Sequence, residues 1–253
     1  MIRSLNTAEN AMLLEQNRID ALANNLANVN TAGFKQILTR VADVAQQGPQ
    51  KEQAESGQVF TPRQGSVPRL AMYHALDNRP GPVKSTGRDT DIAILGQGYF
   101  EVSTDNGKAY TRHGSFLLDA EQRLTTPDGH AVMGERGPIL LAGEEFTIAN
   151  DGAVLVDGKL VDRLKLVAFA DPTRLEHLGA SLVIPPPDME SRVMDEAEVV
   201  VAQGHLEGSN VNPIDTLIAM IAAQRAFEVQ SKVMMTEDEM LEKSVNNLPR
   251  VSG

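Results

Sequence analysis

Apolar residues recur every seven positions near both ends of the chain. Near the start the repeat has a second line three positions further on, which is interrupted at Glu15. A repeat of this kind predicts a helix whose apolar stripe packs against another helix, either at the other end of the chain or in another copy. For the first segment alone, an amphipathic helix on a globular core is the alternative. The positions are Leu5, Met12, Ile19 and Leu26 with Ala8, Leu22 and Val29, and then Met220, Phe227, Met234, Leu241 and Leu248.

Capping residues help to define these two segments. Asn212 is a good N-cap, and Pro213 follows it at the favoured first helical position. Gly33 follows an asparagine-rich stretch, where the left-handed residue that ends a helix is expected. We therefore predict a discontinuous helical domain, made of residues 1–33 and 212–253, whose long helices form a coiled-coil-like pair.

Proline and glycine dominate residues 34–90. A short apolar run between Ile37 and Val44 is compatible with one more helical extension. Beyond it, the density of proline excludes helix from most of the segment and makes long strands unlikely. We expect an extended arm, which is either a disordered linker or a segment that becomes ordered on a neighbouring subunit.

Residues 91–211 carry short apolar runs separated by turn dipeptides. Each dipeptide places a glycine where a hairpin needs a positive φ. These features predict a small antiparallel β domain in the middle of the chain, and hence an α+β fold. The dipeptides are Asn106-Gly107, Asp128-Gly129, Asp151-Gly152 and Asp157-Gly158.

Composition narrows the possible functions. The 253 residues include no cysteine or tryptophan, 4% are aromatic, and the formal charge is −11. Disulfides and thiolate metal sites are excluded, and the acidic balance argues against binding nucleic acid. No stretch approaches the about 18 apolar residues of a membrane span, and polar residues interrupt the first fifteen positions, so we expect neither membrane insertion nor a cleaved signal peptide.

Catalytic motifs are not evident. The five histidines are dispersed, and Gly96-Gln-Gly98 lies between strand candidates where a nucleotide loop would open a helix. We therefore predict no enzyme, with no catalytic, cofactor-binding or metal-ligating residues and no cofactor. A periplasmic carbohydrate-active enzyme with paired carboxylates is the alternative, although the scarcity of aromatic residues disfavours a sugar site.

Several motifs carry a family resemblance. Residues 22–35 read LANNLANVNTAGFK, residues 208–213 read GSNVNP, and residues 220–228 read MIAAQRAFE. With residues 96–100 (GQGYF) and 109–116 (AYTRHGSF), they make the chain similar to the bacterial flagellar basal-body rod and hook proteins. The resemblance covers nearly the whole chain.

The resemblance implies a structural subunit. Such proteins are exported unfolded through the flagellar type III apparatus without a cleaved signal. They polymerise into the rod that crosses the periplasm and transmits motor torque to the hook. The implied partners are further copies, the proximal and distal rod subunits and the hook-side proteins. Residues 206–213 and 133–139 favour a proximal over a distal rod member. A coiled-coil adaptor or export chaperone is the alternative from another class.

A subunit interface is the site that these patterns predict. In the resemblance, the terminal helices form an inner tube, the β domain an outer layer, and the arm contacts neighbours. The predicted interface residues are Leu5, Met12, Ile19, Leu22, Asn24, Asn25, Leu26, Asn28, Val29, Asn30, Gly33, Phe34, Asn210, Asn212, Pro213, Met220, Phe227, Met234 and Leu241.

Overall fold

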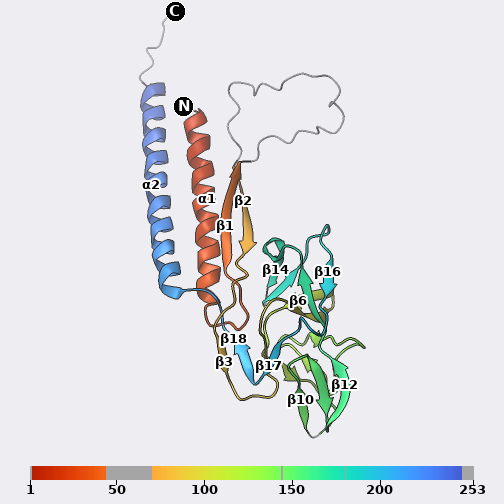
Figure 1. Ribbon diagram of the computed structural model, residues 1–253. Helices are drawn as coiled ribbons and strands as arrows, with labels where there is room; N and C mark the ends of the chain where they lie inside the picture. The colour runs from red at the N-terminus through yellow and green to blue at the C-terminus, as the bar shows by residue number, and fades with distance from the viewer. Residues whose placement is uncertain (1, 44–69, 144, 180, 247–253) are drawn as a thin grey trace, which may run out of the picture. The chain divides into compact units, whose positions relative to one another are not determined.

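The structure is a computed structural model that describes residues 2–43, 70–143, 145–179 and 181–246 (Figure 1). The chain divides into two units. We call residues 1–21, 39–74 and 218–253 the helix unit, and residues 22–38 and 75–217 the β unit.

The described helices are α1 (Ile2–Ala27) and α2 (Pro213–Asn246), besides the short 3-10 helix η1 (Pro172–Arg174). The predicted start of α2 is confirmed, because Asn212 Oδ1 accepts a hydrogen bond from the Ile214 amide at 3.0 Å. The first helix ends at Ala27, well before Gly33, since the asparagine-rich stretch folds into turns. Within the part that the structure describes, neither long helix offers the extended apolar stretch that a membrane crossing requires.

The helix unit holds most of α1 and α2, which Figure 1 shows side by side and running in opposite directions. Strands β1 (Ile37–Asp43) and β2 (Leu70–Leu76) pair with each other. The helical extension expected between Ile37 and Val44 is therefore wrong for the residues described, because a partner distant in sequence draws this run into a strand.

The β unit contains several antiparallel sheets. Its largest sheet, counted over the described strands, has the order β14-β15-β6-β5-β9-β8-β7, and β13 joins β5 to β16. Three smaller sheets are β10-β11-β12, β17-β4 and β18-β3. The strand bounds are β3 (Val83–Ser85), β4 (Ile92–Ile94), β5 (Tyr99–Thr104), β6 (Gly107–Thr111), β7 (Leu117–Leu118), β8 (Leu124–Thr125), β9 (Ala131–Val132), β10 (Phe146–Ile148), β11 (Ala153–Val156), β12 (Lys159–Arg163), β13 (Leu166–Phe169), β14 (Glu176–Gly179), β15 (Leu182–Ile184), β16 (Ser191–Val193), β17 (Val201–Gln203) and β18 (His205–Glu207).

The core of the β unit packs between these sheets. Phe100 and Phe116 are fully buried and meet edge to face, with ring centroids 5.1 Å apart. The hairpin predicted at Asp157-Gly158 is confirmed, with positive φ angles of 50° and 74° at the two turn residues. A hairpin also forms at Asn106-Gly107, where Asp105 and Asn106 join β5 to β6 and Gly107, with a φ of 115°, is the first residue of β6.

The predicted fold class is wrong. A small central β domain with an extended arm was expected, whereas the described chain is mostly strand and its β domain is large. Within the expected arm, β1, β2 and β3 are strands, and residues 44–69 lie outside the described part. Strands of two to seven residues are too short to show a clear alternation, and their partners are distant in sequence.

Candidate functional site

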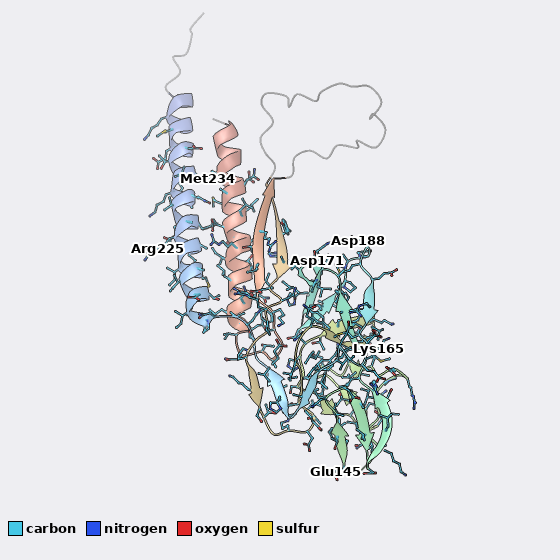
Figure 2. The ribbon with its side chains drawn as sticks, viewed as in Figure 1. Glu145, Lys165, Asp171, Asp188, Arg225 and Met234 are labelled. Carbon is cyan, nitrogen blue, oxygen red and sulfur yellow. The ribbon has the colours of Figure 1, made fainter. Side chains whose placement is uncertain are left out.

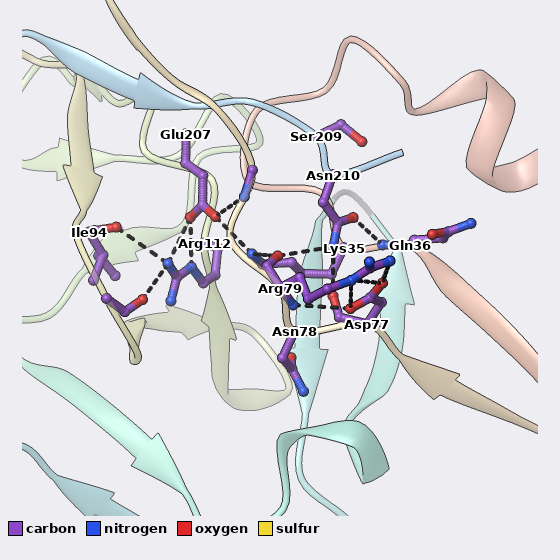
Figure 3. Close-up of polar contacts among 12 residues, drawn as sticks. Lys35, Gln36, Asp77, Asn78, Arg79, Ile94, Arg112, Glu207, Ser209 and Asn210 are labelled. Atoms are coloured by element: carbon purple, nitrogen blue, oxygen red, sulfur yellow. Dashed lines mark hydrogen bonds and ion pairs between the residues drawn. The ribbon is translucent and has the colours of Figure 1, made fainter. Parts of the chain in front are cut away.

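The segment that follows α1 and the segment that precedes α2 meet inside the β unit. The Gly33 amide donates a hydrogen bond to the Glu207 carbonyl at 2.7 Å, and the Asp77 amide donates to the Gln36 carbonyl at 2.9 Å. Three distant stretches of chain therefore converge here. We call the polar side chains that gather here the latch, defined as Asn25, Lys35, Asp77, Arg112, Glu207 and Asn210. Figure 3 labels all of them except Asn25.

A buried carboxylate forms the centre of the latch. Glu207 accepts from Lys35 Nζ on Oε1 at 2.7 Å and from Arg112 Nε on Oε2 at 2.8 Å. The three side chains are at most 5% exposed. The Gly81 amide donates a third bond to Glu207 Oε1 at 2.9 Å. Such pairing is what a buried charge needs, because an isolated one would be strongly destabilising.

Two cations share this one carboxylate, so the cluster has an excess of one positive charge. Backbone carbonyls accept the remaining hydrogen bonds of the two cations. Arg112 donates to the carbonyls of Gly98 and Gly96, each at 2.8 Å, and to that of Ile94 at 3.3 Å. Lys35 Nζ donates to the Arg79 carbonyl at 2.9 Å. The Gly96-Gln-Gly98 loop therefore turns its carbonyls toward an arginine of the same chain.

The charges of the latch have shifted pKa values. Burial lowers the pKa of Lys35, and the hydrogen bond to Glu207 opposes this only in part. For Glu207, burial would raise the pKa, but the charge of Arg112 and the hydrogen bond from Lys35 outweigh it, so the pKa is lowered. The carboxylate is therefore ionised at neutral pH and holds both cations.

Two asparagine amides bind backbone groups at the edge of the latch. Asn25, which is fully buried, donates to the Ile37 carbonyl and accepts from the Ile37 amide, both at 2.8 Å. Asn210 accepts from the Gln36 amide at 2.8 Å and donates to the Asp77 carbonyl at 2.8 Å. These side-chain amides bond to backbone N–H and C=O groups, as the backbone of a neighbouring strand would. They hold the segment that follows α1 and the segment that precedes α2 in place.

Gly33 and Phe34 lie where the chain turns onto the β unit. Gly33 has a φ of 66°, and a Cβ there would collide with the Arg112 carbonyl group. Glycine is thus required for both conformation and space. Phe34 stacks on His177 with centroids 5.6 Å apart, and burial lowers the pKa of His177.

The predicted interface residues divide into groups. Gly33, Phe34, Asn25 and Asn210 come together in or beside the latch, through contacts within one chain. Others lie half-buried on the helices or the turn after α1, or exposed, and the side chains of Leu5 and Leu241 lie outside the described part. The half-buried residues are Met12, Ile19, Leu22, Leu26, Asn28, Val29, Met220, Phe227 and Met234, and the exposed ones are Asn24, Asn30, Asn212 and Pro213.

Sequence reasoning did not single out Lys35, Asp77, Arg112 or Glu207. Three of these are charged residues inside the short motifs quoted for the resemblance, which is the signal that could have found them. Among the described residues, no group of three or more acidic or histidine side chains is arranged to hold a metal ion. The contacts of the latch hold chain segments together and offer no group poised for chemistry.

Comparison with known proteins matches the same three regions. Residues 5–35 match the model described as flagella basal body rod protein, residues 93–156 the flagellar hook protein FlgE/F/G D1 domain, and residues 202–248 the flagellar basal body rod FlgEFG protein C-terminal model. Lys35, Arg112 and Glu207 come from one region each, so the latch joins all three.

Full-length relatives agree. The flagellar basal-body rod protein FlgG of Bacillus subtilis is 33% identical, over 97% of this chain and 99% of its own length. The FlgG protein of Borreliella burgdorferi is 32% identical over 99% and 100%. The FlgF protein of Mesorhizobium japonicum is 29% identical over 97% of each. The chain therefore belongs to the flagellar basal-body rod protein family, whose members are structural proteins and not enzymes.

Proposed function

We propose that this chain is a subunit of the flagellar rod and polymerises through its terminal helices. The observation that carries the proposal is the apolar face that α2 leaves exposed. Ile214, Ile218, Val229 and Met240 are each more than 60% exposed. Their spacing places them on one side of the helix, opposite the half-buried Phe227 and its neighbours.

A helix that is apolar on both sides requires partners on both sides. Figure 1 shows α1 beside α2, and among the described residues the opposite side of α2 keeps its large apolar side chains exposed. A second copy of the chain, or another rod subunit, would cover the other side. A contact between different faces of identical subunits does not close on itself and builds a helical filament, which is the geometry of a rod.

A rod that transmits torque also needs subunits that do not come apart internally, and the latch would provide this internal connection. It ties the segments beside α1 and α2 to the β unit through a fully paired buried charge cluster. A load that reaches these segments would then pass into the rest of the β unit without local unfolding. This role concerns torque, which the rod would carry between the motor and the hook.

The names of the relatives support one position in the rod. Bacillus subtilis and Borreliella burgdorferi FlgG match at 33% and 32% identity, whereas the Mesorhizobium japonicum FlgF protein matches at 29%. We therefore propose the distal segment. The motifs at 206–213 and 133–139 favour the proximal segment, which remains the second candidate.

Location and export complete the proposal. The subunit would reach the periplasmic part of the basal body through the flagellar type III apparatus. The absence of cysteine suits a chain that travels unfolded into an oxidising compartment. Its partners there would be the other rod subunits and the hook-side proteins.

Replacing Ile218 by Asp tests polymerisation. A charge on the exposed apolar face should abolish incorporation into basal bodies, measured by purification of hook–basal bodies and by motility, while the β unit melts unchanged. The matched control is Leu160→Asp on β12, where the leucine is 57% exposed. Normal incorporation of Ile218→Asp would contradict the proposal.

Labelling tests the position. A tag inserted in the β unit at the turn that contains the exposed Gly158 should be seen by electron microscopy on the hook-side half of purified rods. Tags confined to the motor-side end would show that the proximal assignment is correct and the distal one wrong.

A further inference from the structure

Methionine is the only source of sulfur in this chain, which has ten methionines and no cysteine. Met235 and Met240, both on α2, are 63% and 61% exposed. The other methionines whose side chains the structure describes are half-buried, namely Met12, Met133, Met189, Met194, Met220 and Met234. Two thioethers of the described part therefore differ from the rest in their access to solvent.

Both methionines belong to the exposed apolar side of α2. Met240 follows Ile218 by about six turns at 3.6 residues per turn, so the two side chains point to the same side. Met235 follows Ile221 by about four turns, with the same result. Ile218 is 62% exposed and Ile221 is 48% exposed. Arg225 follows Ile218 by about two turns, and Figure 2 shows it projecting from the side of α2 that faces away from α1. The two thioethers therefore lie on the face that the proposed function assigns to polymerisation.

An exposed thioether reacts with hydrogen peroxide in a two-electron step. The sulfur lone pair attacks one oxygen of the peroxide, and the O–O bond breaks. The hydroxide that leaves then takes the proton from the new S–OH group and becomes water. Sulfur is oxidised, the peroxide is reduced, and the product is methionine sulfoxide. An apolar side chain thereby becomes polar, which disrupts interfaces that contain methionine.

We propose that Met235 and Met240 are an oxidation site of the free subunit, and that a sulfoxide at either position keeps the subunit out of the rod. The effect on assembly rests on the proposed polymerisation through α2. Burial of an apolar methionine side chain is favourable, whereas a buried sulfoxide oxygen needs a hydrogen-bond donor. The helix itself remains folded, because both side chains project into solvent in the free subunit. In an assembled rod, the subunit contact shields the same thioethers from peroxide.

Peptide mass spectrometry of the full-length free subunit tests the site. After a short exposure to hydrogen peroxide, Met235 and Met240 should gain one oxygen atom each before the half-buried methionines do. Met234 is the matched comparison, because it is adjacent to Met235 in the sequence but half-buried. Fragmentation spectra separate these two neighbours. Equal oxidation of Met234 and Met235 would overturn the site, whether or not the chain enters rods.

Competition inside one cell tests the effect on assembly. The wild type is produced together with the double variant Met235→Leu/Met240→Leu, which keeps apolar, helix-favouring side chains and cannot be oxidised at these positions. After a pulse of hydrogen peroxide, the ratio of variant to wild type in new hook–basal bodies should rise on the order of tenfold over the untreated culture, because burial of such a side chain contributes about that much. Both copies meet the same other rod proteins, so oxidation elsewhere affects them alike.

The control for this competition is Met133→Leu/Met194→Leu in the β unit, whose ratio to wild type should not change with peroxide. An unchanged ratio for Met235→Leu/Met240→Leu would overturn the effect on assembly. Absence of the untreated wild type from rods would instead contradict the proposed function, and the order of oxidation in the free subunit would stand by itself.

Discussion

The latch and the long helices treat their polar and apolar groups in opposite ways. In the latch, Glu207 meets two cations and a backbone amide, and Asn25 uses both ends of its amide within the chain. On the helices, Ile218 is 62% exposed, and the buried Glu15 Oε2 has no hydrogen-bond partner among the described residues, with Arg18 Nη1 at 3.9 Å. The latch is therefore complete within one chain, whereas α2 leaves large apolar side chains exposed among the described residues.

Residues of one motif can therefore differ in role: some make contacts within the chain, and others are available for contacts outside it. Asn25 and Lys35 lie in the run 22–35 that carries the resemblance, yet they bind within the chain. A buried, fully paired cluster resists change, because loss of one member leaves the others unpaired. The side chains of an exposed apolar face do not depend on one another in this way, and they remain available to bind a partner. The comparison can be tested on the latch side by three substitutions.

The largest effect is expected for Glu207→Ala. Lys35 and Arg112 would both remain buried without their carboxylate, which should lower the free energy of unfolding of the β unit by about 3–5 kcal/mol. Chemical denaturation of the free subunit measures it. Glu198→Ala is the control, since its partner Arg192 is exposed, and its midpoint should stay unchanged. A similar midpoint for both variants would mean that the latch is not the tie described above.

A smaller effect is expected for Gly33→Ala. The new Cβ would meet the Arg112 carbonyl, and the φ of 66° is strained for alanine, so the β unit should lose about 2–4 kcal/mol. Gly87→Ala is the matched control, because Gly87 has a φ of 71° and a Cβ there would have nothing within 4 Å. Its loss should be about 1–2 kcal/mol, from backbone strain alone. Equal losses in thermal denaturation would contradict the close approach at Gly33.

The smallest effect is a change in pH dependence. Because burial lowers the pKa of His177, the unfolded chain binds more protons than the folded one just below the usual value of 6.5. Stability should therefore fall as the pH falls from 6.5 toward the lowered folded pKa. His177→Phe keeps the stack on Phe34 and should flatten this slope by up to about 1.4 kcal/mol per pH unit.

Denaturation midpoints between pH 5 and 7 measure the slope, with the exposed His74→Phe as control. The contribution of Glu207 to stability is lost at a lower pH than that of His177. Its pKa is lowered, so its stabilising effect persists through this window and is lost only as the pH falls below its usual value of 4.5. An unchanged slope in His177→Phe would mean that His177 is not the titrating group.

Local signals in the sequence determined the helices and several turns. Seven-residue repeats and the cap at Asn212 predicted α2, and Asp157-Gly158 predicted its hairpin, because each feature depends on residues close together in the chain. The motifs likewise identified the family. Local signals underestimated the size of the β domain. They also favoured a helix at Ile37, where the structure has a strand, because a strand forms only with a partner that can lie far away in the sequence.

Tertiary structure alone decided the latch and the exposed faces. Lys35 and Glu207 are 172 positions apart, and neither is conspicuous among 57 charged residues, the sum of 23 basic and 34 acidic side chains. Only the folded β unit brings them to 2.7 Å and removes water from around them. Periodicity predicts that a helix has an apolar stripe, but which side stays uncovered depends on what packs beside it. Long-range proximity and burial are properties of the whole fold, and no window of the sequence contains them.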